Sequence, residues 1–133
     1  MGIFSKKELN SFETVFWRIS GMRGSTEYEI VNKGEESEFT EYMMRCAKGG
    51  GMERVPERSV TCKTERILEI LNSCEVASWD GFHGKHPKGV RDGIMFRFEL
   101  VVGGDEKITA EGSENFPKHF REFRDAMREL LNS

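Results

Sequence analysis

Residues 94–102 carry the sequence Ile-Met-Phe-Arg-Phe-Glu-Leu-Val-Val, in which large apolar side chains fall at every second position. Successive side chains of a β-strand point to opposite faces of a sheet, so this period of two predicts a strand. Its apolar face consists of Ile94, Phe96, Phe98, Leu100 and Val102. Because so much apolar surface requires cover, we expect this strand to lie against the hydrophobic core.

The residues that follow predict a hairpin. Residues 103–105, Gly-Gly-Asp, are typical of a short turn, and residues 107–111 return as a partner strand with one small apolar side and one charged side. Arg97 and Glu99 lie on the outward side of the first strand, which predicts an ion pair between them at the surface. Residues 112–115, Gly-Ser-Glu-Asn, then break the hairpin.

The carboxyl-terminal part of the chain has helical periodicity. Apolar side chains recur there at alternating steps of four and three, at Phe116, Phe120, Phe123, Met127 and Leu130. This spacing predicts an amphipathic helix that runs nearly to the end of the chain, with Pro117 in its first turn, where a missing N–H costs nothing. We expect Phe120 and Phe123 to be buried together with Phe96 and Phe98 of the strand.

The amino-terminal half predicts three strands in a meander. Residues 12–20 alternate around Trp17, and a second strand follows around Tyr28 after a glycine-containing turn. Residues 39–47 predict the third strand. Residues 49–51 are three consecutive glycines, which cost too much backbone entropy for a regular element and predict a mobile connection.

The period changes at Thr64, which predicts a helix of about three turns. Its apolar face consists of Ile67, Leu68, Leu71 and Cys74. The side chain of Thr61 or of Thr64 can cap the first turn. The order along the chain is then three strands, a helix, two strands and a second helix, without the strand–helix alternation of a parallel sheet.

The predicted fold class is therefore α+β. We expect an antiparallel sheet of about five strands with two helices packed on one face. Residues 1–133 are few enough for a single domain around one core. Residues 1–10 are a candidate disordered amino-terminal segment.

The charge balance bears on the possible partners. The chain has 20 basic and 23 acidic residues and a formal net charge of -3. Without an overall positive field, binding to nucleic acid or to an anionic membrane surface is disfavoured. The longest stretch without a charge is far too short to cross a bilayer, and no targeting segment is evident.

Three cysteines, Cys46, Cys62 and Cys74, form no C-x-x-C pair, which argues against a disulfide framework, a zinc site or a redox motif. Free thiols in a reducing cytosol fit best, so we expect a cytoplasmic protein. Cys46 and Cys74 fall on predicted apolar faces and are interpreted as small core residues. Cys62 lies beside Lys63 near a predicted helix start, where a cation and a helix terminus can favour a reactive thiolate.

The chemically richest segment is residues 79–93, whose five glycines and prolines exclude a continuous regular element. Binding residues concentrate in loops that a rigid scaffold holds. We therefore predict that this segment forms a recognition surface for a protein partner or a small ligand, with Trp79, Phe82, His86 and Arg91 as candidate contact residues. The alternative for Trp79 and Phe82 is that they cover the edge of the core and tether the loop.

The same segment offers possible metal ligands. Asp80, His83, His86 and Asp92 supply nitrogen and oxygen donors suited to zinc or iron. A metal-bound water there would make the protein a small metal-assisted hydrolase. The alternative is that the histidines are simply exposed to solvent, because a flexible loop does not aim two imidazoles at one point. The sequence assigns no cofactor and no catalytic residue.

Between Tyr28 and Leu131, a predicted hairpin and short helix lead to four short motifs. They are Trp79-Asp80-Gly81-Phe82, Asp92-Gly93 before Phe96 and Phe98, Gly112-Ser113, and Phe116-Pro117 before Phe120 and Phe123. This order, over about three quarters of the chain, resembles that of small bacterial α+β domains of unknown function. The resemblance implies a cytoplasmic bacterial protein and transfers no activity and no catalytic residue.

Three hypotheses result. A non-enzymatic binding or protein-interaction domain that uses residues 79–93 is favoured, and the metal-assisted hydrolase is the alternative. The third is a structural homodimer, in which an exposed strand edge or the apolar region of Met43 and Met44 pairs two chains.

Overall fold

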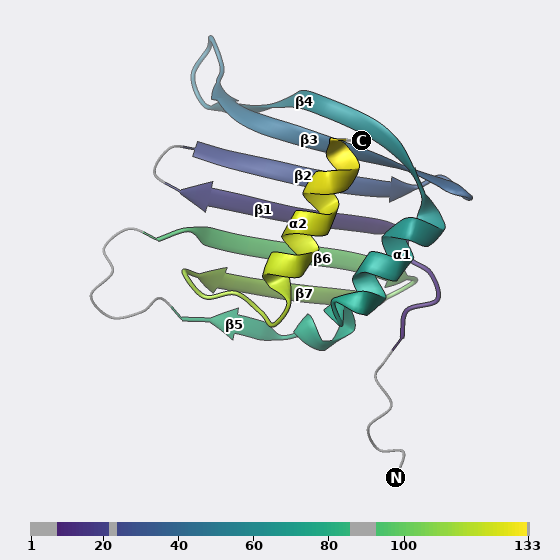
Figure 1. The fold of residues 1–133 in the computed structure, drawn as a ribbon. Helices are drawn as coiled ribbons and strands as arrows, with labels where there is room; N and C mark the ends of the chain where they lie inside the picture. Colours follow the sequence, from purple (N-terminus) through teal and green to yellow (C-terminus); the bar gives the residue numbers. More distant parts are fainter. Residues whose placement is uncertain (1–7, 22–23, 86–92, 133) are drawn as a thin grey trace.

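The computed structural model describes residues 8–21, 24–85 and 93–132. Within them, seven strands form one sheet in the order β4-β3-β2-β1-β6-β7-β5, and both α-helices lie on the same face of it (Figure 1). The strands are β1 (Thr14–Gly21), β2 (Gly24–Asn32), β3 (Glu36–Cys46), β4 (Met52–Lys63), β5 (Phe82–Gly84), β6 (Met95–Gly103) and β7 (Glu106–Ser113). The helices are α1 (Thr64–Ser73), a short 3-10 helix (Val76–Trp79) and α2 (Phe120–Leu131).

The predicted α+β class with a mainly antiparallel sheet is confirmed, but the predicted number of strands and the predicted order of strands and helices along the chain were wrong. The sequence predicts about five strands, whereas the described residues form seven. One additional strand is β4, which follows β3 and precedes α1. Its sequence shows no clear apolar alternation because β4 lies at the edge of the sheet and most of its side chains are exposed. Pro56 is tolerated there because one side of an edge strand pairs with no neighbour.

The other additional strand is β5, which pairs in parallel with β7 at the opposite edge of the sheet. It lies in the segment that was predicted to be irregular, because periodicity cannot reveal a strand of three residues. Residues 49–51 lie in the turn between β3 and β4. The Gly50 N–H donates to the carbonyl of Ala47, and the Ala47 N–H donates to the carbonyl of Gly51, so this turn is closed by backbone hydrogen bonds.

The two helix starts differ in detail from the prediction. No side chain caps α1, and the hydroxyl of Thr64 lies instead 2.7 Å from the hydroxyl of Ser37 in β3. α2 begins at Phe120, later than predicted, because His119 takes a left-handed conformation with φ 68°. Pro117 therefore precedes the helix, and its carbonyl accepts a hydrogen bond from the N–H of Phe120.

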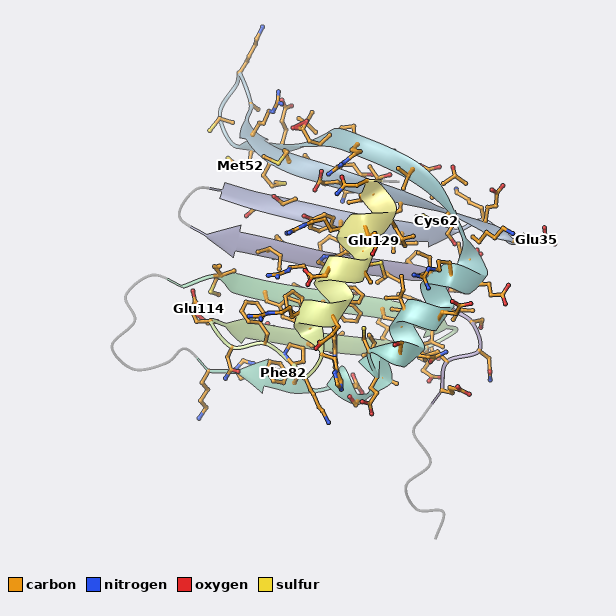
Figure 2. All side chains as sticks on the ribbon, in the orientation of Figure 1. Glu35, Met52, Cys62, Phe82, Glu114 and Glu129 are labelled. Carbon is orange, nitrogen blue, oxygen red and sulfur yellow. The ribbon has the colours of Figure 1, made fainter. Side chains whose placement is uncertain are left out.

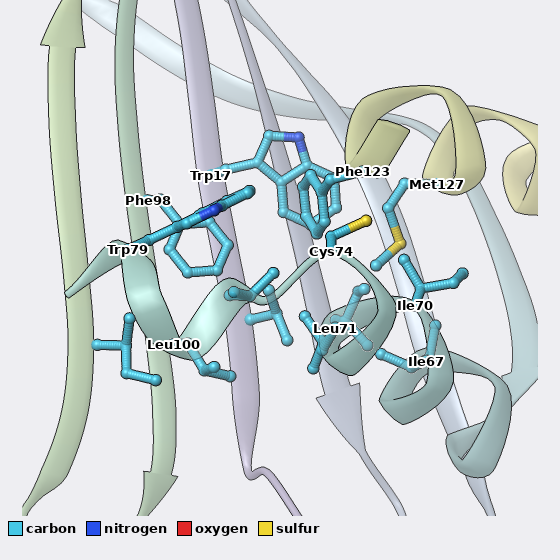
Figure 3. Close-up of a cluster of buried hydrophobic side chains, with 14 of the residues drawn as sticks. Trp17, Ile67, Ile70, Leu71, Cys74, Trp79, Phe98, Leu100, Phe123 and Met127 are labelled. Carbon is cyan, nitrogen blue, oxygen red and sulfur yellow. The ribbon is translucent and has the colours of Figure 1, made fainter. Parts of the chain in front are cut away.

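The core lies between the sheet and the helices (Figure 3). The predicted joint burial of four phenylalanines is confirmed: the ring centroids are 4.7 Å apart for Phe96 and Phe120, and 5.8 Å apart for Phe98 and Phe123. Trp17 of β1 packs edge-on against Phe123 at 4.8 Å. The strand over residues 94–102 thus lies against the core, as its alternation predicts.

Two further contacts fasten irregular segments to this core. Leu9 is buried, and its backbone exchanges two hydrogen bonds with the side chain of Asn72 in α1. Residues 1–7 of the candidate disordered segment lie outside the described residues. Asn115 packs so closely on β5 and β7 that a Cβ on Gly84 or Gly112 would collide with it. This close approach explains glycine at both positions.

The sheet has one covered face and one open face. Trp17 and Phe98 point toward the helices, so alternation places their neighbours Arg18 and Arg97 on the other side. No helix of the described chain covers that side (Figure 1), which we call the open face. None of the described helices is long and apolar enough to cross a membrane.

Candidate functional site

The segment predicted to form a recognition surface contributes one core residue. Trp79 is 1% exposed, and its Nε1 donates a hydrogen bond to the carbonyl oxygen of Lys118 at 2.8 Å. A ligand at the surface cannot contact such a side chain, and its burial agrees with the alternative interpretation, in which Trp79 tethers the segment to the core. Phe82 lies on β5 and is half-buried (Figure 2). His86 and Arg91 lie outside the described residues.

The residues considered as metal ligands have other partners where they are described. Oδ1 of Asp80 accepts a hydrogen bond from the backbone N–H of Thr109 at 3.1 Å. Nδ1 of His83 lies 3.0 Å from Oε1 of Glu111. His86 and Asp92, the other two donors, lie outside the described residues. In the described part of the chain, no group of three or more His, Cys, Asp or Glu side chains is arranged to hold a metal ion.

The two less exposed thiols, Cys62 and Cys74, are not activated as nucleophiles. Burial raises the pKa of the Cys62 thiol, and burial together with the nearby Glu122 charge raises the pKa of Cys74 to about 11. Both thiols are therefore protonated near neutral pH, whereas a nucleophile needs the thiolate. Cys46 is exposed, so its interpretation as a core residue was wrong. The end of the β3–β4 hairpin extends beyond the helices (Figure 1), and residues 48–54 there are exposed.

A row of charged side chains crosses the middle of the open face. Arg18 of β1 and Arg97 of β6 are direct cross-strand partners. Glu27 of β2 lies beside Arg18, and Glu111 of β7 lies beside Arg97. Like charges directly opposite one another destabilise a sheet, so the pairing of these two arginines lowers the stability of the sheet. The fold does not require this pairing.

Each flanking carboxylate is shared between two groups. Glu27 is only 7% exposed, and its Oε2 lies 3.6 Å from Nη1 of Arg18. Its Oε1 lies 3.5 Å from Nη1 of Arg54 in β4. Glu111 places Oε2 at 3.7 Å from Nη1 of Arg97 and Oε1 at 3.0 Å from His83. Neither central arginine therefore has a carboxylate to itself. Both keep nitrogen donors for another acceptor, because a guanidinium carries five N–H groups.

The central arginines line a cavity of about 580 Å³ on the open face. This volume falls in the range of roughly 300–1,000 Å³ that is usual for small-ligand sites. Its charged lining side chains are Arg18, Lys85, Arg97 and Glu111. Among the described residues, three cations and one carboxylate line the cavity, and Glu27 contacts Arg18 from beside it, so the cavity is locally positive on a chain whose overall charge is negative. An anion is the ligand that such a cavity favours.

Small hydroxyl side chains provide both space and further donors. Ser20, Ser25 and Ser113 line the cavity, and their short side chains leave room above the sheet. Ser20 and Ser25 pair with each other across β1 and β2, two residues along their strands from the paired Arg18 and Glu27. A hydroxyl can donate to an anion without adding charge, so Ser20 and Ser25 together with the arginines can surround one acidic group.

The sequence pointed to the outward position of Arg97 but not to its partner. The predicted ion pair between Arg97 and Glu99 is not formed: Glu99 lies 3.1 Å from Lys107, and Arg97 pairs with Glu111. Glu111 lies directly opposite Arg97 on the hairpin partner, closer than a residue two positions away on the same strand, and Lys107 reaches Glu99 diagonally from that partner. The contribution of Arg18 was missed because β1 and β6 are far apart in the sequence. Only their pairing shows that the two arginines are neighbours.

Comparison of the chain with known protein families and with curated proteins finds no match. The geometry and charge of the open-face cavity are therefore the observations on which a function can rest.

Proposed function

We propose that the protein is a non-enzymatic binding module that holds a small anionic ligand in the open-face cavity. The observation that carries the proposal is the direct cross-strand pairing of Arg18 with Arg97 inside this cavity. An anion between the two guanidinium groups offsets their repulsion and accepts charge-assisted hydrogen bonds from both. The site includes His83 and Lys85, so it uses part of the segment that the sequence indicated.

The surroundings of the cavity favour a small ligand over a long polyanion. Beyond the central pair, the open face carries carboxylates on both sides, including Glu27, Glu29 and Glu111. A nucleic acid lying across the sheet would meet these negative charges, whereas a phosphate or carboxylate group of limited size contacts the positive centre alone. We also propose a cytoplasmic location, since three free cysteines fit a reducing compartment.

The first test is calorimetric titration with inorganic phosphate and with citrate. We expect saturable binding by the unmodified protein, and a loss of affinity of about tenfold or more when Arg18→Gln and Arg97→Gln are combined, because a charged hydrogen bond contributes roughly 1.5–3 kcal/mol. Ligand at about a hundred times its dissociation constant stabilises the native state by roughly 2.7 kcal/mol, so a thermal shift of several degrees provides a second readout.

The matched control is Lys107→Gln. Lys107 is an exposed cation of the same sheet, and its ion pair with Glu99 is similar to the pair of Arg97 with Glu111, but it does not line the cavity. The control should bind phosphate and citrate as the unmodified protein does. Equal weakening by this control would show nonspecific charge attraction, and no binding of either anion by the unmodified protein would overturn the proposal.

A further inference from the structure

α2 carries three arginines along one flank. Arg121, Arg124 and Arg128 are separated by three and four residues, which places them on one stripe of the helix. The adjacent stripe is buried against the sheet and consists of Phe120, Phe123, Met127 and Leu131. The arginine stripe therefore follows the border between the packed side of the helix and solvent, over β1 and β2.

Below this stripe lies a groove of about 670 Å³, on the covered face of the sheet and thus opposite the open-face cavity. Its apolar lining includes Ile19, Tyr28, Ile94 and Phe116. Ile94 is 43% exposed, although it belongs to the apolar side of the strand around β6. The helices thus leave part of the apolar sheet surface uncovered at this end.

A smaller cavity of about 100 Å³ continues the groove and shares Trp17, Tyr28, Arg124 and Arg128 with it. Glu41 and Arg58 line this end and are 3.3 Å apart. The ring of Tyr28 stacks on Trp17 at 4.9 Å between centroids and forms a rigid aromatic floor. The groove is therefore apolar at its base and continues toward a polar end.

The charge along the groove is strongly one-sided. Among the described residues, its lining contains the three arginines and a single carboxylate, Glu122, and the lining His119 lies 2.9 Å from Glu75 and 3.8 Å from Glu122. Arg124 also contacts Asp125, the next residue in the chain, at 3.3 Å, an exposed pair of little energetic weight. An apolar base under a row of guanidinium groups is complementary to a molecule that has an apolar body and a negative group.

We propose that this groove binds an amphipathic organic anion, with its apolar part on Ile19, Tyr28 and Phe116 and its acidic group at Arg124 and Arg128. The volume is in the range of small-molecule sites, and an apolar lining with a few placed polar groups is their usual composition. The site is separate from the open-face cavity, and none of the described residues lines both.

At the polar end, burial and the neighbouring Glu41, which accepts a hydrogen bond from the Tyr28 hydroxyl, raise the pKa of Tyr28 to about 12. Tyr28 therefore contributes its ring to the groove, and the arginines supply the donors for an anion.

The test is calorimetric titration of the full chain with octanoate and with octanol. We expect octanoate to bind saturably and octanol at least about tenfold more weakly, because the alcohol cannot form charge-assisted hydrogen bonds with the arginines. Combining Arg124→Gln with Arg128→Gln should weaken octanoate to a similar degree. Arg66→Gln, which removes an exposed arginine of α1 outside the groove, should leave the affinity unchanged.

A second variant tests the apolar part. Ile94→Ser should weaken octanoate, while its exposure means that the fold is retained, as circular dichroism can check. Binding that persists in the arginine double variant, or equal binding of octanol, would overturn the proposal, as would the absence of octanoate binding. Combining Arg18→Gln with Arg97→Gln should leave octanoate binding intact, so failure of the open-face cavity and failure of the groove are distinguishable.

Discussion

Trp79→Phe tests whether Trp79 is a core residue or a contact residue. The substitution removes the hydrogen bond from Nε1 to Lys118, which contributes about 1 kcal/mol. It also removes roughly 40 Å³ of buried side chain, which at about 24 cal/mol per Å³ adds about 1 kcal/mol of cavity cost. Lost apolar burial adds a further amount on the order of 1 kcal/mol. The free energy of unfolding should therefore fall by about 2–3 kcal/mol.

Urea unfolding followed by far-ultraviolet circular dichroism measures this change without relying on the fluorescence of the substituted residue. Trp79 packs at 5.0 Å from Phe98 and at 5.3 Å from Phe123, so relaxation can fill only part of the space (Figure 3). The phosphate affinity of the variant should equal that of the unmodified protein, since Trp79 does not line the open-face cavity. A stability change below about 0.5 kcal/mol would refute the assignment to the core.

Three further expectations follow from local contacts. Gly112→Ala should lower the free energy of unfolding in urea by about 1–3 kcal/mol, because the new Cβ would overlap the backbone oxygen of Asn115. Gly103→Ala is the control and should cost much less, because the space around that position is open. Tyr28 has a pKa of about 12 instead of 10.0, so its contribution to the free energy of unfolding should be complete below pH 10 and lost as the pH rises toward 12. An ultraviolet titration that places the pKa of every tyrosine near 10.0 would contradict this expectation. Iodoacetamide followed by mass spectrometry should modify the exposed Cys46 first and the buried Cys74 only on unfolding, and equal rates would contradict their placement.

Where one face of an element is buried, the sequence predicted the structure well. The alternation around Phe96 and Phe98 and the helical spacing of Phe120 and Phe123 both arise because core burial imposes the period of the element. The α+β class follows from these two patterns. The prediction failed for β4, because an exposed edge strand has no buried face and therefore no such period.

The candidate site was predictable only in part. Residues 79–93 do contribute His83 and Lys85 to the open-face cavity, but the richness of that segment in aromatic residues pointed to Trp79, which is buried. The pairing of Arg18 with Arg97 joins strands distant in the sequence, and no local pattern specifies which strands become neighbours. A single outward arginine on a strand does not indicate a binding site. The direct pairing of Arg18 with Arg97 inside one cavity is the feature that indicates an anion site.

The most direct test of the proposed function is a phosphate titration followed by two-dimensional amide NMR spectra of isotopically labelled protein. If an anion occupies the open-face cavity, the amide signals of Ser20, Ser25 and Ser113 should move together and saturate with one dissociation constant, because these residues line it. Amides beside Lys107, on the same sheet but outside the cavity, should not move. Signals that stay in place, or that drift without saturation over the whole surface, would contradict an anion site between Arg18 and Arg97.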